Sequence, residues 1–84
     1  FMAANYSDIK SWFEDGVSQK NKTHMIIVCD TFDYDDYPVY VSEDENVHEI
    51  QNEYDNKDMQ KVMEVYNLSK DMEQQLSMTR CFCY

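Results

Sequence analysis

The feature of the sequence that most constrains the fold is the segment 23–29, which reads Thr-His-Met-Ile-Ile-Val-Cys. Its apolar and β-branched residues stand at consecutive positions, whereas a half-buried strand alternates apolar with polar residues. The segment is therefore predicted to be a central strand with both faces buried. A chain of 84 residues has a thin core, because it buries only about 60% of its extended surface. Cover for both strand faces must come from helices on each side or from a second copy of the chain.

Helical spacing precedes this strand, and a second strand follows it. The segment 8–20 places apolar residues at i, i+3, i+4 and i+8, which indicates a helix with one buried face. These residues are Ile9, Trp12, Phe13 and Val17. Ser7 is the expected N-cap. Residues 31–38 are expected to form a turn or hairpin arm. Pro38 cannot donate to a strand ladder, so it is placed at a strand start or edge, before a second, antiparallel strand at 39–41.

The second half of the chain is predicted to be mainly helical. Three helical faces follow in order: Val47, Ile50 and Tyr54; Met59, Val62, Met63 and Tyr66; and Met72 with Leu76. Asn46 with Glu49 resembles a capping box for the first helix. Asp55 or Asn56 is the expected cap of the second helix, and Ser69 that of the third.

The last segment, 80–84, is apolar and β-prone, and it is expected to add a third strand against residues 25–29. The predicted fold class is therefore α+β, with a small two- or three-stranded antiparallel sheet packed with three to four short helices. Phe1 before Met2 is interpreted as a cloning remnant. Residues 2–84 are then predicted to form a single domain.

The charge of the chain is concentrated in one window. The net charge is −10, and the window 30–55 contains ten acidic residues without a single Lys or Arg. Seven acidic and seven basic residues balance in the rest of the chain. Direct nucleic-acid binding needs Lys and Arg against phosphates, so it is not expected. A basic protein surface is the natural complement of the window, and a solvated face that keeps the chain soluble is the alternative interpretation.

Four tyrosines lie inside the acidic window. Tyr34 and Tyr37 are candidates for a recognition surface or for the core, whereas Tyr40 and Tyr54 are assigned to the core. Carboxylates interleaved with tyrosines suit an Arg-rich partner. The predicted partner-binding residues are Asp30, Asp33, Tyr34, Asp35, Asp36, Tyr37, Glu43, Asp44, Glu45, Glu49 and Glu53.

Two clusters contain residue types that could support metal binding or catalysis. The acidic residues of the segment 30–36 could hold Mg²⁺ or Ca²⁺, or act as general acid and base, but the calcium-loop pattern is not met. Cys81-x-Cys83 with Cys29 and His24 has the ligand types of a zinc site but lacks its usual spacing, so core thiols are expected. No cofactor, no metal and no catalytic residue is therefore assigned, and a metal-dependent enzyme using the 30–36 cluster is kept as an alternative.

Location follows from what the sequence lacks. No run approaches the roughly 20 apolar residues that span a bilayer, and the N-terminus has no basic and apolar regions of a signal peptide. Three cysteines are an odd number and are interpreted as reduced thiols. A cytoplasmic protein without membrane contact is expected, in the host cell if the gene is carried by a phage.

The segment 23–41, Thr-His-Met-Ile-Ile-Val-Cys-Asp-Thr-Phe-Asp-Tyr-Asp-Asp-Tyr-Pro-Val-Tyr-Val, together with 59–68, resembles small uncharacterised proteins encoded by phages and bacteria. The resemblance covers roughly residues 20–70 and implies no activity for any single residue. In size and charge, though not in motif, the chain also resembles phage anti-CRISPR proteins and other DNA mimics.

The leading hypothesis is a non-enzymatic acidic protein, phage-encoded, that inhibits a nucleic-acid-binding host defence protein by charge mimicry. Asp33 and Asp35 on a strand would lie roughly 6.6 Å apart, close to the roughly 6.8 Å of two phosphate steps. Glu49 and Glu53 on one helix face offer a similar spacing. The alternative is an oligomer, with a homodimer as its simplest form, that sequesters a small ligand or nucleotide signal. The acidic window disfavours anionic ligands for such an oligomer, unless its pockets between subunits are lined by Lys20, Lys22, Lys57, Lys61 or Arg80.

Overall fold

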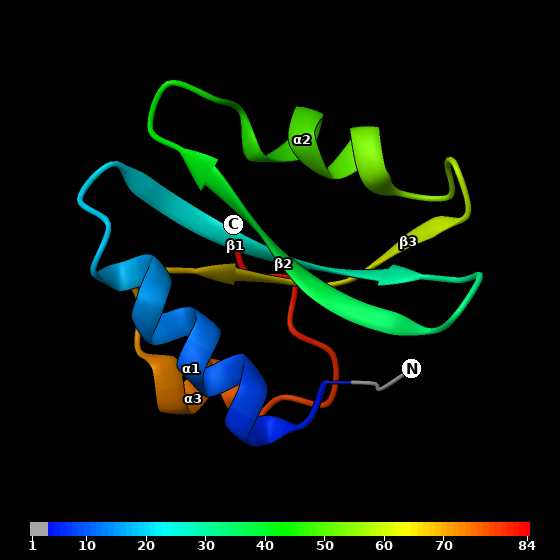
Figure 1. The fold of residues 1–84 in the computed structure, drawn as a ribbon. Helices are drawn as coiled ribbons and strands as arrows, with labels where there is room; N and C mark the ends of the chain where they lie inside the picture. The colour runs from blue at the N-terminus through cyan, green and yellow to red at the C-terminus, as the bar shows by residue number, and fades with distance from the viewer. Residues whose placement is uncertain (1–3) are drawn as a thin grey trace.

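The computed structural model describes residues 4–84, so the predicted start at Met2 lies outside the described residues. The fold is α+β, as predicted: a three-stranded antiparallel sheet with three short helices in the described chain (Figure 1). The elements are α1 (Tyr6–Val17), β1 (Lys22–Asp30), β2 (Asp35–Ser42), α2 (Val47–Tyr54), β3 (Gln60–Asn67) and α3 (Met72–Leu76).

Strand β1 is the central strand of the sheet, whose order is β2-β1-β3. Five consecutive residues of β1, Met25 to Cys29, are buried. Helices α1 and α3 cover one face of the sheet and α2 covers the other (Figure 1). The two-sided burial predicted for this strand is therefore confirmed, and helices of the same chain provide the cover on both faces.

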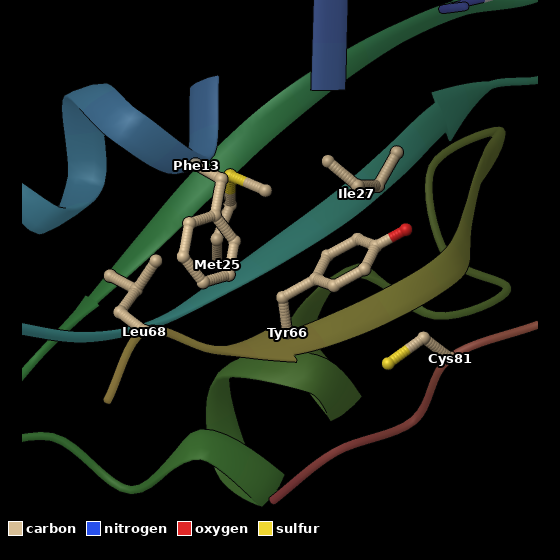
Figure 2. Packing of buried hydrophobic residues seen from close by; sticks show 6 residues of the cluster. All are labelled: Phe13, Met25, Ile27, Tyr66, Leu68 and Cys81. Atoms are coloured by element: carbon tan, nitrogen blue, oxygen red, sulfur yellow. The ribbon is translucent and has the colours of Figure 1, made fainter. Parts of the chain in front are cut away.

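The face under α1 and α3 carries the larger side chains. Met25 and Ile27 of β1 pack with Phe13 of α1 and Tyr66 of β3. The rings of Phe13 and Tyr66 are arranged edge to face, with their centroids 6.3 Å apart. Figure 2 shows these side chains converging with Leu68 and Cys81 between the sheet and the helix layer. Aromatic pairs in this arrangement stabilise a core beyond the area they bury.

The opposite face carries β-branched residues under α2. Ile26 and Val28 pack with valines of the two outer strands, and Val47, Ile50 and Tyr54 of α2 close this cluster. These three residues are the helical face predicted for 47–54, and Asn46 caps α2 by accepting hydrogen bonds from the amides of its first turn. This helix and its N-cap residue Asn46 are thus confirmed, and the hydrogen bonds of the cap are those that the Asn46 side chain accepts.

Two other caps differ from those predicted. Helix α1 is capped by Asn5 and not by Ser7, because the Asn5 side chain accepts from the third helical amide at 2.9 Å in a capping box. Helix α3 is capped by Asp71 and not by Ser69. In both cases a side chain with a carbonyl or carboxylate oxygen directly precedes the first helical residue, where it reaches a free amide of the first turn.

The helix predicted over the face Met59 to Tyr66 is wrong, because residues 60–66 lie in strand β3 and Met59 lies in the turn before it. The register of β3 against β1 shifts at a bulge that leaves Met63 as an extra residue. As a result Val62 and Val65, three residues apart, lie on the α2 side of the sheet, whereas Met63 and Tyr66 lie on the other side. A bulged strand buried on both faces therefore reproduces helical spacing.

The C-terminal strand predicted against residues 25–29 is also wrong. Both edges of β1 are occupied, by β2 and by β3. The last residues lie beside β3 instead, where Phe82 forms a parallel bridge with Val65. The Val65 amide donates to the Cys81 carbonyl at 2.8 Å, and the Cys83 amide donates to the Val65 carbonyl at 2.9 Å. The segment protects part of the outer edge of β3.

Candidate partner-binding site

Two loops meet at one end of the sheet and form what we call the acidic tip, residues 30–36 and 55–59. The first contains the turn between β1 and β2, and the second joins α2 to β3 (right side of Figure 1). The Thr31 amide and hydroxyl both donate to the Met59 carbonyl, at 2.7 and 2.8 Å. These two bonds fix the loops side by side, although 28 residues separate them in the sequence.

The backbone of the acidic tip adopts an unusual conformation. Positive φ angles occur at Tyr34 (61°), Asn56 (59°), Asp58 (52°) and Met59 (61°), and all the non-glycine residues of this kind in the described chain lie in these two loops. The left-handed region is unfavourable for residues with a Cβ atom, and it persists where surrounding contacts determine the backbone. The backbone of the acidic tip is therefore held in one defined conformation by its surrounding contacts.

Large apolar side chains project from the acidic tip into solvent. Phe32 is 76% exposed, and Met59 is 57% exposed. Tyr34 is 59% exposed and stands two residues from Phe32 on the same turn. Exposed apolar side chains that are gathered in one place and rimmed by polar groups mark interaction sites more often than scattered ones.

The same two loops carry a high density of carboxylates. The acidic tip contains six aspartates and one lysine: Asp30, Asp33, Asp35, Asp36, Asp55, Asp58 and Lys57. Several also shape the loops: Asp30 accepts from the Phe32 amide at 2.9 Å, and Asp33 accepts from the Asp35 amide at 3.2 Å. Each such carboxylate keeps further acceptor positions for an external cation.

The remaining residues of the acidic window do not belong to the acidic tip. Glu43, Asp44 and Glu45 lie in the turn at the far end of β2, roughly 24 Å away along an eight-residue strand. Glu49 and Glu53 are exposed on α2. The acidic window, which is continuous in the sequence, is therefore divided into three separate acidic areas on the surface.

The structure also reassigns individual residues of the predicted site. Tyr37 is half-buried and packs against the cluster under α2, so its core alternative applies. Asp33 lies in a turn, so it does not form the strand spacing with Asp35 that phosphate mimicry requires. Glu49 and Glu53 keep their helical spacing. Phe32 and Met59 were missed as site residues, because the exposure of an apolar side chain has no sequence signal of its own.

The cysteines lie in or beside the core. Among residues 4–84 no group of three or more His, Cys, Asp or Glu side chains is placed to hold a metal ion. Cys29 and Cys81 are buried, and Cys83 is half-buried. Burial, with Asp36 beside it, raises the pKa of the Cys29 thiol, and burial raises the pKa of Cys81 to about 11. Thiols in this state are protonated and poor nucleophiles near neutral pH.

Both histidines contact the same residue, Tyr84. The Nε2 atom of His24 lies 3.0 Å from the Tyr84 carbonyl oxygen. The His48 ring stacks on the Tyr84 ring at 4.2 Å, and the Tyr84 hydroxyl donates to Gln51 of α2 at 2.8 Å. Because these contacts join the C-terminal segment to β1 and α2, the imidazoles have a structural role in the described chain.

The carboxyl group of Glu64 is partly buried on the face of the sheet that α1 and α3 cover. Burial raises the pKa of Glu64, although the neighbouring Tyr66 hydroxyl, the Cys81 amide and the Arg80 charge favour its ionised form. Burial, together with Glu64, raises the pKa of the Tyr66 phenol. This arrangement is a polar pair inside the packing, at a distance from the loops of the acidic tip.

Comparison with known proteins identifies no relative, so the function is proposed from the geometry of the structure. No protein-family model, no curated protein and no solved structure matches the chain. None of the helices in residues 4–84 has the length and apolar character needed to cross a membrane.

Proposed function

We propose that the protein is a non-enzymatic binding protein that engages a basic surface of another protein through the acidic tip. The observation that carries the proposal is the exposure of Phe32 and Met59 among six aspartates, on loops held together by the Thr31–Met59 hydrogen bonds. A solubilising surface needs the charges, but it does not need exposed apolar groups on the same loops.

The combination suits a partner that presents arginine next to an apolar pocket. Aromatic anchors contribute most at the centre of an interface, where water is excluded, and charges at the rim guide association. Carboxylates bind guanidinium groups through paired hydrogen bonds, and several around one aromatic ring suit a cluster of arginines. The fixed loops reduce the entropy lost on binding.

A narrower form of the proposal is a phage-encoded inhibitor that occupies the nucleic-acid channel of a host defence protein. The net charge of −10 supports this form, and the resemblance expected from the sequence, to small proteins of phages and bacteria, is what suggests a phage origin. Glu49 and Glu53 on the outer face of α2 would extend the contact with a basic channel beyond the acidic tip. Binding of this kind weakens steeply as salt screens the charges.

The test compares charge reversal at two acidic areas. Substitution of Asp33, Asp35 and Asp36 by Lys changes the same charge as substitution of Glu43, Asp44 and Glu45 by Lys. Fluorescence anisotropy with a labelled peptide that alternates Arg with apolar residues measures binding, and circular dichroism checks the fold. We expect the tip variant to lose binding and the far-end variant to keep most of it.

A second pair of variants tests the apolar contribution. Substitution of Phe32 and Met59 by Ser keeps every charge, and we expect it to weaken peptide binding by about tenfold or more, the scale of one interface anchor. Equal loss in both charge-reversed variants, with no effect of the apolar substitutions, would show attraction by net charge alone and reject the proposed site.

A further inference from the structure

A pocket of about 210 Å³ lies at the other end of the sheet from the acidic tip. It is formed where α1 ends, β1 begins and β3 ends. Its apolar wall is made by Val17 and Leu68, and its polar wall by Gln19, Lys20, Lys22, Thr23 and Ser69. The volume is below that of a typical drug-sized site, so it suits a small group and not a whole dinucleotide.

The charge of this pocket is opposite to that of the molecule. The chain has 17 acidic residues, yet the lining contains two lysines and no carboxylate. In the described residues, the ion pair within 4.0 Å is Lys10–Glu73, and neither Lys20 nor Lys22 takes part in one. The pocket therefore has lysines in its lining without an ion pair among the described residues, on a protein with a net charge of −10.

The side chains of the polar wall have hydrogen-bond donors that are not used within residues 4–84 of the protein. Lys22 Nζ donates one hydrogen bond, to the Ser42 hydroxyl at 2.8 Å, and an ammonium group has three N–H bonds. The side-chain amide nitrogen of Gln19 donates one long hydrogen bond, of 3.4 Å, to the Asp15 carbonyl. This bond uses one of the two N–H groups of the amide. The Ser69 hydroxyl, by contrast, already donates to the Asn67 side chain at 2.6 Å.

The geometry points to a binding site for a phosphate monoester with a short apolar substituent. Two ammonium groups match the charge of a monoester, which approaches −2 at neutral pH because its second pKa is about 6. Lysine binds phosphate as a point charge and needs no fixed angle. Val17, which is 54% exposed and lines the same pocket as the two lysines, offers a surface for the apolar part. The site is separate from the acidic tip and does not depend on the proposed function.

A purely structural role for the lysines makes different predictions. Lys20 follows the C-terminal end of α1, where a cation is favoured by the helix dipole. The Glu43 amide donates to the Asn21 carbonyl at 2.8 Å, so the acidic turn of residues 43–45 lies close to the two lysines. In that role their substitution changes stability, but added phosphate compounds produce no localised response.

The experiment titrates the labelled protein with butyl phosphate, inorganic phosphate and butanol, at constant ionic strength and followed by amide NMR. We expect saturable shifts at residues 17–23 and 68–69 with butyl phosphate, with a dissociation constant on the order of 1 mM for so small and open a site. Inorganic phosphate should bind several-fold more weakly, and butanol should give no saturation.

Two double variants decide the outcome. K20Q/K22Q should lose the saturable shifts, whereas K57Q/K61Q, which removes the same charge near the acidic tip, should keep them. V17A should weaken butyl phosphate and leave inorganic phosphate unchanged. Shifts spread over all seven basic residues, equal loss in both double variants, or no saturation at about ten times the expected constant would each overturn the inference.

Discussion

Gly16 shows how closely α1 approaches the sheet at the level of a single residue. A Cβ atom at this position would lie 2.8 Å from the ring of Tyr40 and 3.0 Å from a methyl group of Leu68. The Tyr40 ring cannot move aside freely, because its hydroxyl donates to the Trp12 carbonyl at 2.7 Å. The one glycine of the chain therefore serves close packing and not a turn.

Replacing Gly16 by alanine should therefore destabilise the protein, even though alanine favours helices. Overpacking costs about 1–3 kcal/mol, and the gain in helix propensity is about 1 kcal/mol, so we expect a net loss of roughly 1 kcal/mol. Urea denaturation measures the free energy of unfolding. Ser11→Ala, at an exposed position of the same helix, is the control and should be neutral or slightly stabilising. A variant at Gly16 as stable as the parent would contradict the close contact.

Glu64 gives a prediction about pH. Burial raises the folded-state pKa of this carboxyl above its unfolded value, so the folded state binds its proton more tightly than the unfolded state. The stabilisation is complete below the unfolded pKa and is lost as pH rises through the folded pKa. Glu64→Gln should therefore raise the melting temperature at pH 7 and have a smaller effect, or the opposite one, near pH 4.

Thermal denaturation of the parent and of Glu64→Gln over that pH range checks this sign. Glu14→Gln, at an exposed position of α1, is the control. A Glu64→Gln variant that is less stable at pH 7 than at pH 4, relative to the parent, would show that Arg80 and the hydrogen bonds outweigh burial.

At the scale of elements, one side chain of α3, Gln75, forms hydrogen bonds to the backbone of β3, in addition to the apolar packing of Met72 and Leu76. Gln75 is 2% exposed, and its amide oxygen accepts from the Asn67 amide at 2.8 Å. Its amide nitrogen donates to the Asn67 carbonyl at 2.9 Å. The side-chain amide thus pairs with the last residue of β3 as a neighbouring strand would, and it satisfies both backbone groups of that residue.

Gln75→Ala should accordingly cost about 2–4 kcal/mol, because it leaves a buried amide and a buried carbonyl of Asn67 without partners. The neighbouring Gln74→Ala is a matched control, since its side chain is exposed and the change should stay within about 0.5 kcal/mol. Chemical denaturation measures both variants. Equal stability of the two would mean that water replaces the Gln75 amide.

The sequence predicted elements well where one physical signal dominated. Strand β1 was predicted from consecutive apolar residues, and α2 from its cap and apolar face. Strand β3 was not predicted, because a bulge at Met63 gives a strand the spacing of a helix. The bulge depends on pairing with β1, which no local pattern encodes.

The candidate site was predicted in part for the same reason. The aspartates of the segment 30–36 were singled out by composition, and they lie at the acidic tip. Met59 was counted with a helical face, and its place beside Thr31 follows only from the pairing of β3 with β1. A surface made from two loops becomes visible when the topology brings those loops together.

At the scale of the whole molecule, the negative charge opposes folding with little compensation from ion pairs. The net charge is −10, and within residues 4–84 one ion pair joins oppositely charged side chains, Lys10–Glu73 at 3.6 Å. Both of these side chains are substantially exposed, so the pair contributes little. Repulsion among carboxylates therefore exceeds attraction between opposite charges.

Salt should consequently stabilise this protein. The screening length falls from about 10 Å at 0.1 M to about 3 Å at 1 M, and we expect the free energy of unfolding to rise by on the order of 1 kcal/mol over this range as the repulsion is screened. Urea denaturation at several NaCl concentrations measures the effect.

The double variant E43Q/D44N removes two exposed charges from one turn. It should be more stable than the parent at low salt and should respond less to added salt. A parent protein that loses stability with salt would show that attractive pairs dominate instead, and a double variant with unchanged salt response would place the repulsion elsewhere on the molecule.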